Sequence, residues 1–166
     1  MVAEKPVGKP VSASAMTTVR LMMPADANIA GNVFGGAIMR YMDEIAAVVA
    51  FKHARKLVVT ASIDRMSFWR PVYVGNLLVL KCAVNYVGRT SMEVGVRIEA
   101  EDLLKQTVTY TGSCYLTYVA LDQQTGRPTP IASVIPRTEA QKRRFREALG
   151  RRRRREYERR ARRVTE

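Results

Sequence analysis

Hydrophobic and polar positions alternate along the middle of the chain. In Leu77–Val87 and Ser91–Glu101 every second residue is largely apolar, and in Ser91–Glu101 charged residues fill most of the positions between. A period of two residues is typical of a strand with one buried and one solvated face. Thr107–Leu121 continues the pattern, while Thr17–Met23 and Val58–Trp69 are rich in β-branched and aromatic residues. We therefore expect five strands, the last four joined by short connections.

A helical pattern separates the first two strands. From Gly36 to Arg55 apolar residues point all round the helix axis, and the segment is too short and too interrupted by charge to span a bilayer. We expect this helix to be buried. Because one helix cannot cover both faces of a parallel sheet, the pattern favours an α+β fold with a curved antiparallel sheet wrapped around one central helix.

The two ends differ from this body, which we place at residues 16–124. Residues 1–15 are rich in Pro, Gly, Ser and Ala and are expected to form a disordered arm. In the extension at residues 125–166, Thr138–Gln141 matches a capping box, which predicts a basic helix or tail. Arg151–Arg155 has little apolar surface to bury, so this part is expected to be an exposed or frayed helix.

Charge and composition narrow the class of protein. The 166 residues carry a net charge of +13, and Arg137–Glu166 alone holds 14 Lys and Arg against 5 Asp and Glu. Such a tail suits ligand phosphates, weak contact with an anionic surface, or simple solvation. Among the arginines from Arg151 to Arg163, Tyr157 is the one aromatic residue, so nucleic-acid binding is not expected. The start of the chain lacks an apolar signal-peptide core, and a cytoplasmic location without a membrane span is expected.

The two cysteines and the single histidine give little evidence for a metal site or for nucleophilic catalysis. Cys82 and Cys114 lie in predicted strands without metal-ligand spacing and are expected to be buried free thiols. No metal site is expected, since the chain has one histidine. That residue, His53, lies about 15 Å beyond Asp43 along the helix, which disfavours Ser-His-Asp or Cys-His catalysis. We interpret it as a helix-end residue near the C-terminal dipole.

Asp43 is the feature of the buried helix that most needs an explanation. A carboxylate is rarely buried without a partner. It either pairs with an Arg or caps backbone, or it is a general base or nucleophile in a cleft. Gly35 and Gly36 at the helix start either permit a tight turn, or leave backbone N–H groups open to a phosphate or an oxyanion.

The spacing between Gly36 and Asp43 indicates whether one chain can form a complete site. Gly36 and Asp43 lie seven residues apart, about 10 Å along the helix, whereas a reacting carbonyl needs its base and its oxyanion donors close together. Two antiparallel helices would bring the glycine end of one chain to the aspartate of another. We therefore predict a homodimer with two equivalent sites at its interface.

Several blocks of sequence resemble a known family. They are P-A-D-A-N-I-A-G-N-V-F-G-G-A-I-M-R-Y-M-D-E-I-A, V-V-T-A-S-I-D, R-P-V-Y-V-G-N, V-G-R-T-S-M-E-V, T-Y-V-A-L-D and G-R-P-T-P. In this order they are similar to the hotdog-fold acyl-CoA thioesterases of the brain acyl-CoA hydrolase and bacterial YciA type. The resemblance covers about Met16 to Arg146. It implies hydrolysis of acyl-CoA to a free acid and CoA without a metal or cofactor, in a homodimer or a trimer of dimers.

The resemblance also implies roles for individual residues. Asp43 acts as general base or nucleophile, Asn28 positions the thioester or water from the other subunit, and the N–H groups of Gly35 and Gly36 are the oxyanion donors. Substrate and CoA binding is expected at a second set of positions, where an exposed turn or ordinary sheet hydroxyls remain the alternative. That set comprises Thr60, Ser62, Arg89, Thr90 and Ser91.

Two other functions fit the same fold. A non-catalytic acyl-CoA sensor would normally carry an N-terminal DNA-binding module, and only a short arm precedes the first strand. A dehydratase would need a histidine near the helix start, where none is found before His53. Met39, Met42, Phe68 and Trp69 either shape an acyl tunnel or pack in the core, and the sequence does not specify the acyl length.

Overall fold

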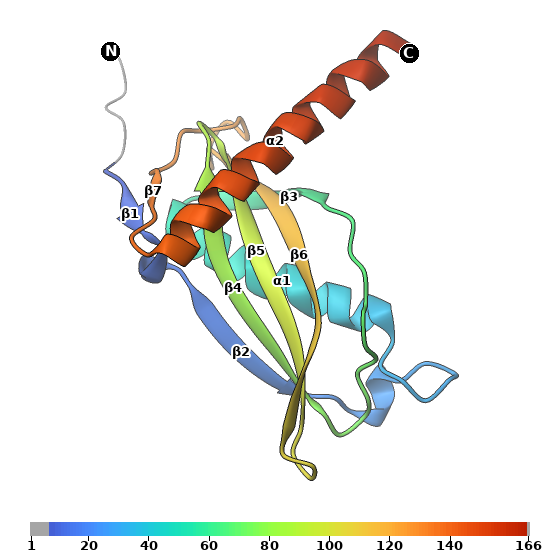
Figure 1. Ribbon diagram of the computed structural model, residues 1–166. Helices are drawn as coiled ribbons and strands as arrows, with labels where there is room; N and C mark the ends of the chain where they lie inside the picture. Colours follow the sequence, from blue (N-terminus) through green and yellow to red (C-terminus); the bar gives the residue numbers. More distant parts are fainter. Residues whose placement is uncertain (1–6, 166) are drawn as a thin grey trace, which may run out of the picture.

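The fold is a five-stranded antiparallel sheet curved around one helix, with a second helix on the outer face (Figure 1). The computed structural model describes the backbone of residues 7–165 and the side chains of residues 7–161. The sheet has the order β2-β4-β5-β6-β3, and β1 and β7 form a small parallel pair. The elements are β1 (Lys9–Pro10), η1 (Val11–Ala13), β2 (Met16–Leu21), η2 (Pro24–Asp26), α1 (Gly35–Ala54), β3 (Leu57–Ile63), β4 (Leu77–Val87), β5 (Ser91–Asp102), β6 (Thr107–Leu121), β7 (Val134–Ile135) and α2 (Glu139–Thr165).

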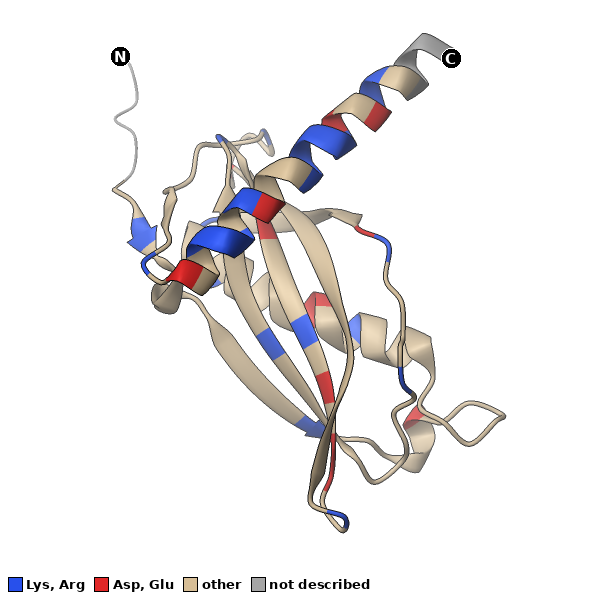
Figure 2. Cartoon of the chain, in the orientation of Figure 1, with Lys and Arg blue, Asp and Glu red and all other residues tan. Residues whose placement is uncertain are grey.

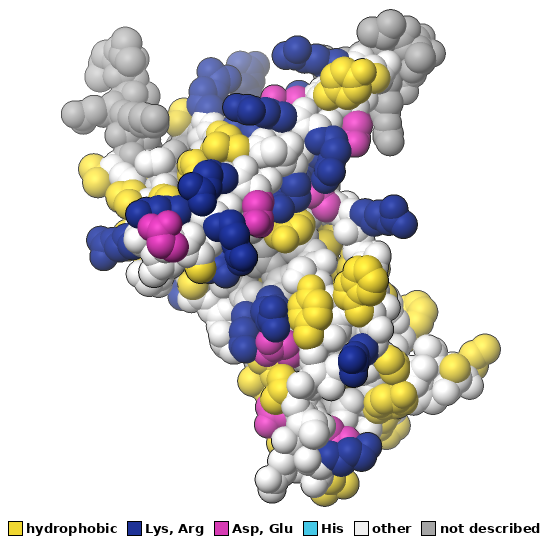
Figure 3. Space-filling view, viewed as in Figure 1, with side chains coloured by type: hydrophobic (Ala, Val, Ile, Leu, Met, Phe, Trp, Pro, Cys, Tyr) yellow, Lys and Arg dark blue, Asp and Glu magenta, His cyan; other side chains and the backbone are white. Residues whose placement is uncertain are grey.

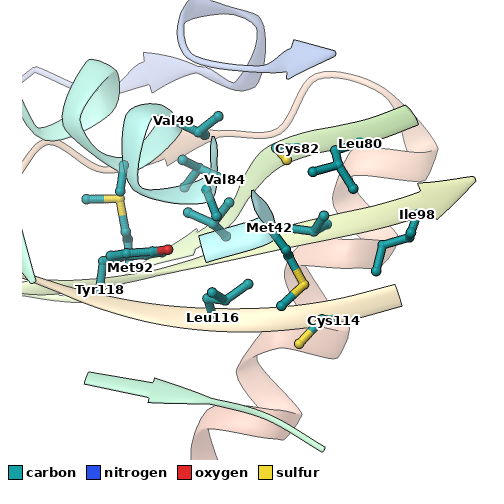
Figure 4. Close-up of a cluster of buried hydrophobic side chains, with 14 of the residues drawn as sticks. Met42, Val49, Leu80, Cys82, Val84, Met92, Ile98, Cys114, Leu116 and Tyr118 are labelled. Atoms are coloured by element: carbon teal, nitrogen blue, oxygen red, sulfur yellow. The ribbon is translucent and has the colours of Figure 1, made fainter. Parts of the chain in front are cut away.

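The core lies between α1 and the concave face of the sheet. Alternate residues of β4, β5 and β6 point toward the helix and are fully buried, as the period of two predicts (Figure 4). Met42 and Val49 of α1 pack against them. Cys82 and Cys114 are buried free thiols, as expected, and burial raises the pKa of the Cys82 thiol to about 12 and that of Cys114 to about 11.

The central helix is not enclosed on every side by its own chain. Met39, Val48 and Phe51 expose 38 to 42% of their surface, and on the neighbouring strand β3 Leu57 and Val59 are similarly exposed. The edge of β3 opposite β6 has no strand partner among the described residues. The expectation of a helix buried all round is therefore wrong for the single chain, which leaves an apolar face along α1 and β3.

Three predictions about boundaries and single residues differ from the structure. Strand β3 ends at Ile63, not at Trp69, and the chain then leaves the regular ladder. Residues 7–15, expected to be disordered, hold β1 and η1, with Val11 buried; residues 1–6 lie outside the described part. His53 lies in the last turn of α1, as predicted, but it is fully buried, and burial lowers its pKa, which disfavours the charged form that would interact with the helix dipole.

The helix α2 crosses the outer face of the sheet, opposite α1, and then extends beyond it (Figures 1 and 2). Phe145 packs edge to face against Tyr86 of β4, with ring centroids 5.2 Å apart, and Ala148 is fully buried. The predicted helix is confirmed, but it is docked rather than free. Among the described residues, no helix is long and apolar enough to cross a membrane.

Candidate active site

The carboxylate of Asp43 is held by two hydroxyl groups from the sheet. Thr60 donates from Oγ1 to Asp43 Oδ1 at 2.9 Å, and the Tyr118 hydroxyl donates to the same oxygen at 2.8 Å. The Tyr118 oxygen also lies 3.0 Å from the Asp43 backbone carbonyl. Both donors therefore converge on Oδ1, and no described residue donates a hydrogen bond to Oδ2. A carboxylate fixed through one oxygen presents the other for chemistry.

The pairing of β3 with β6 explains why these two hydroxyls meet. Thr60 lies opposite Tyr118 in the antiparallel register, so both side chains leave the sheet on the face that covers α1. Tyr118 is completely buried. Burial and the hydrogen bond to Asp43 raise the pKa of its phenol well above the ordinary value, which keeps the proton on the donor.

A β-bulge at Ala61 separates the roles of Thr60 and Ser62. After the bulge Ser62 lies opposite Thr117 rather than Leu116, which turns its side chain to the outer face of the sheet. Residues two apart in a regular strand would share a face. Thr60 is therefore brought to Asp43, whereas Ser62 is not.

The start of α1 presents open backbone donors. The carbonyl of Phe34 accepts hydrogen bonds from Ala37 N–H and Ile38 N–H, which leaves the first two helical N–H groups, those of Gly35 and Gly36, without an acceptor in the helix. A Cβ on Gly36 would lie within van der Waals overlap of the Phe34 ring. Glycine is thus required here for an aromatic ring to lie against the backbone beside the open N–H groups.

The loop before α1 is anchored by Asp26, a residue that the sequence did not single out. Its carboxylate accepts hydrogen bonds from Met23 N–H at 3.0 Å and from the Tyr41 hydroxyl at 2.7 Å, and these bonds hold its pKa below the usual range. The Asp26 carbonyl accepts from Phe34 N–H at 2.7 Å. Asp26 therefore connects the loop to the N-cap of α1 through Phe34 and to its second turn through Tyr41.

Asn28 closes the base of a tight turn in this loop, where its N–H donates to the Asn32 carbonyl at 2.7 Å. Its side-chain oxygen accepts from Ala30 N–H at 2.9 Å and from Asn32 N–H at 3.2 Å. The amide nitrogen of Asn28 forms no hydrogen bond with the described residues, so it can donate to a ligand. The oxygen shapes the loop, and the nitrogen is left as a donor.

A groove of about 1220 Å³ lies on the outer face, between the sheet and α2. Ser62 lines it together with Arg89, Thr90 and Ser91 at the β4–β5 turn, so four of the five predicted binding residues share one cavity. The turn is fixed by its backbone, because Arg89 and Thr90 carbonyls accept hydrogen bonds from Ile131 and Ala120. Thr60, the fifth, contacts Asp43 instead.

The single chain therefore holds two separate parts of a site. Asp43 lies seven residues after Gly36, about 10 Å along the axis of α1, and no described contact joins it to Asn28. The missed residues are Tyr118 and Asp26. The alternation of β6 shows only that Tyr118 faces the core, and its hydrogen bond depends on the register set by the bulge.

The remaining candidates divide between core and surface. Met42 is fully buried against the sheet, whereas Met39, Phe68 and Trp69 are exposed. The Phe68 ring lies 3.3 Å from the position of a Cβ on Gly35. Phe34 and Phe68 thus form an aromatic border around the open end of α1, and the tunnel suggested for Met42 is core packing.

The known proteins that are similar to this chain agree on one family. Residues 30–106 match the thioesterase superfamily. Protein VdlD of Helicobacter pylori is 40% identical over 131 residues, which cover 79% of this chain and 74% of VdlD. The uncharacterized acyl-CoA thioester hydrolase YkhA of Bacillus subtilis is 38% identical over 118 residues, 71% of this chain and 68% of YkhA. The cytosolic acyl coenzyme A thioester hydrolase of Rattus norvegicus is 34% identical over 143 residues, 85% of this chain but only 37% of that longer protein.

Solved structures agree over almost the whole chain. A hexameric acyl-CoA thioesterase, solved in its apo form, has a TM-score of 0.88 at 42% identity, with 92% of this chain and 97% of that chain covered. An acyl-CoA hydrolase of Staphylococcus aureus, in complex with butyryl coenzyme A, coenzyme A and coenzyme A disulfide, has a TM-score of 0.87 at 37% identity, with 95% of each chain covered. Structures of that hydrolase with alanine replacing an aspartate, a threonine or an asparagine also match, each at 36% identity.

Proposed function

The chain belongs to the thioesterase superfamily and is an acyl-CoA thioester hydrolase, and we propose that it acts where two copies of the chain meet. Asp43 with Thr60 and Tyr118 comes from one copy. The N–H groups of Gly35 and Gly36, with the Asn28 amide, come from the other. The observation that carries this proposal is the convergence of two hydroxyl donors on one oxygen of Asp43, which leaves its second oxygen available to water.

The proposed reaction is a general-base hydrolysis. Asp43 Oδ2 takes a proton from a water molecule, whose oxygen attacks the thioester carbonyl carbon. The carbonyl oxygen becomes an oxyanion and accepts hydrogen bonds from Gly35 and Gly36 N–H. As the intermediate collapses, the C–S bond breaks and the CoA sulfur takes the proton back from Asp43. The products are a carboxylic acid and CoA.

These steps use only the acyl-CoA, water and groups of the protein, so we propose that no metal or organic cofactor takes part. The alternative is direct attack by Asp43 to form an anhydride. In a single turnover in ¹⁸O-water, general-base hydrolysis places the isotope in the released acid. Attack by Asp43 would expel CoA and form an anhydride; if water then opens this anhydride at the Asp43 carbonyl, the isotope enters the protein and the first acid molecule is unlabelled.

The apolar face along α1 and β3 supports assembly with a second copy. It joins Val48 and Phe51 of α1 to Leu57 and Val59 of β3, beside a strand edge whose N–H and C=O groups can pair with another strand. Similar chains have been solved as hexamers. We propose a homo-oligomer built from such dimers, and a trimer of dimers as its full form.

The outer groove supports a site for the CoA portion of the substrate. Arg89 supplies a guanidinium and Thr90 and Ser91 supply hydroxyls, which suit phosphate oxygens. Ser62 lines this groove two residues from Thr60 on the edge strand β3, but on the opposite face of the sheet from Asp43. We propose that the flexible pantetheine arm passes the edge of the sheet at this end of β3 to join the two regions. By analogy with the cytosolic relatives, we propose a cytoplasmic location.

The test is release of free thiol from a panel of acyl-CoA chain lengths. Wild-type protein should release CoA, and Asp43→Asn should lower kcat at least about 1000-fold because the base is lost. Glu44→Gln is the matched control. Glu44 is the adjacent carboxylate of α1, paired with Arg40 on the exposed face, and its loss should leave kcat unchanged. Equal activity of wild type and Asp43→Asn would contradict the proposal.

A further inference from the structure

The arginine-rich helix α2 forms one wall of the outer groove. Arg152, Arg154, Arg155 and Arg159 line the cavity opposite the residues of β3 and of the β4–β5 turn. Lys and Arg side chains gather along α2 over the outer face of the molecule (Figure 3). The sequence interpretation of a solvated extension therefore does not describe this part of α2, which faces a cavity of about 1220 Å³.

Arg152 and Arg155 of this wall, with the neighbouring Arg151, anchor the helix to the sheet. Arg155 donates to Asp64 at 2.6 Å and to Glu93 at 3.1 Å, and Arg151 grips Glu93 with bonds of 2.7 and 3.1 Å. Glu93 is only 2% exposed. Arg152 donates to the Tyr86 hydroxyl at 2.8 Å and pairs with Glu156. Because these contacts are bidentate or buried, they fix the rotation of α2 about its axis.

The remaining cations of the groove outnumber its remaining carboxylates. Asp64, Glu93 and Glu156 are already neutralised by α2 itself. Among the described residues, no ion pair is formed by Arg154 or Arg159 on the helix, or by Arg65 or Arg89 across from it. Glu158 is the one lining carboxylate without an ion pair in the same set. The groove therefore holds an excess of positive charge fixed in place by a buried network.

We propose that Arg154 and Arg159 of α2, together with Arg89, bind the phosphates at the nucleotide end of CoA, and that α2 thereby selects acyl-CoA over acyl-pantetheine. The inference rests on the proposed function and names which part of the substrate this wall recognises. Guanidinium groups match phosphate oxygens in charge and geometry. Acyl-pantetheine carries the same thioester without phosphates, so it can reach Asp43 but gains nothing from the helix.

The experiment compares two double variants on two substrates. Arg154→Gln with Arg159→Gln removes the groove-facing charges. Arg153→Gln with Arg160→Gln removes the same charge from exposed positions of α2 that do not line the groove. For the first variant, kcat/KM on acyl-CoA should fall about 10- to 100-fold, mainly through KM, and its dependence on salt should weaken. On acyl-pantetheine it should stay within about twofold of wild type, and the control variant should match wild type on both substrates.

Calorimetric titration with CoA and with pantetheine separates this inference from the catalytic proposal. Weaker CoA binding in the groove variant alone supports the inference even if the wild type proves inactive, an outcome that would overturn only the proposed function. Equal losses in both double variants would mean a general effect of charge and would overturn the inference. Equal losses on acyl-CoA and acyl-pantetheine would overturn it too, because they would assign the arginines to fold or chemistry.

Discussion

Replacing Tyr118 by Phe tests whether the hydroxyls around Asp43 serve catalysis. The substitution removes one oxygen and keeps the buried ring, which packs in the core without solvent exposure. It deletes the 2.8 Å hydrogen bond to Oδ1 and leaves only Thr60, at 2.9 Å, to orient the carboxylate. A hydrogen bond to a charged group contributes about 1.5 to 3 kcal/mol.

If most of this stabilisation serves to orient Oδ2 toward water, kcat should fall about 10- to 100-fold. KM should change by less than about twofold, since the phenol lies on the buried side of the carboxylate. The double variant Thr60→Val with Tyr118→Phe should lose less than the product of the single losses, because both donors act on the same oxygen.

Steady-state thiol release, with the free energy of unfolding measured in urea, is the assay. Tyr110→Phe is the matched control on the same strand, where the hydroxyl contacts only Ser113 at the surface. An unchanged kcat in Tyr118→Phe, or a lower stability with full activity, would refute a catalytic role for the hydroxyl and reduce Tyr118 to packing.

Three further predictions concern the glycine end, the anchor of α2 and the buried histidine. Gly36→Ala should keep the fold, because the Phe34 ring that a Cβ would overlap is half-exposed and can move, but kcat/KM should fall at least about tenfold as the N–H groups become harder to reach. Glu93→Gln should lower the free energy of unfolding by about 2 to 4 kcal/mol in a urea titration, because Arg151 and Arg155 lose a buried counter-charge, while exposed Glu147→Gln should cost less than about 1 kcal/mol. Burial lowers the pKa of His53 below its ordinary value of 6.5, so the unfolded chain binds a proton at His53 more readily than the folded chain does. The contribution of neutral His53 to the free energy of unfolding should therefore be complete above pH 6.5 and decrease as the pH falls below 6.5. His53→Gln should remove that part of the pH dependence.

The sequence specified the sheet well where one face alone is buried. The bounds of β4 were predicted without error, and those of β5 to within one residue, because their alternation is regular. β3 was predicted to run to Trp69, since Phe68 and Trp69 favour strands. The pairing with β6 ends at Ile63, and the aromatic residues beyond it lie on an irregular segment. Composition cannot show where a strand loses its partner.

The site was predictable residue by residue only where a local motif carried it. Asp43 and the paired glycines stand out within one helix, whereas Tyr118 lies 75 positions away and reaches Asp43 only through the register of two strands. The bulge that sends Thr60 and Ser62 to opposite faces also leaves no mark in the sequence. The sequence also indicated no partner for Arg151 and Arg155. The alternation of Ser91–Glu101 places Glu93 on a solvated face of the strand, whereas in the structure α2 covers that face and both arginines pair with Glu93.

The central claim is that one chain supplies the base and another supplies the oxyanion donors. Subunit complementation tests it: Asp43→Asn and the double variant Asn28→Asp with Gly36→Ala are unfolded together, refolded at equal amounts and assayed for thiol release. Asn28→Asp keeps the side-chain oxygen that shapes the loop and removes the amide donor. Random pairing of two nearly inactive parents should restore roughly a quarter of wild-type activity, because half of the dimers would contain one intact site. If the mixture is no more active than its parents while mixed oligomers are shown to form, the site is not shared between subunits.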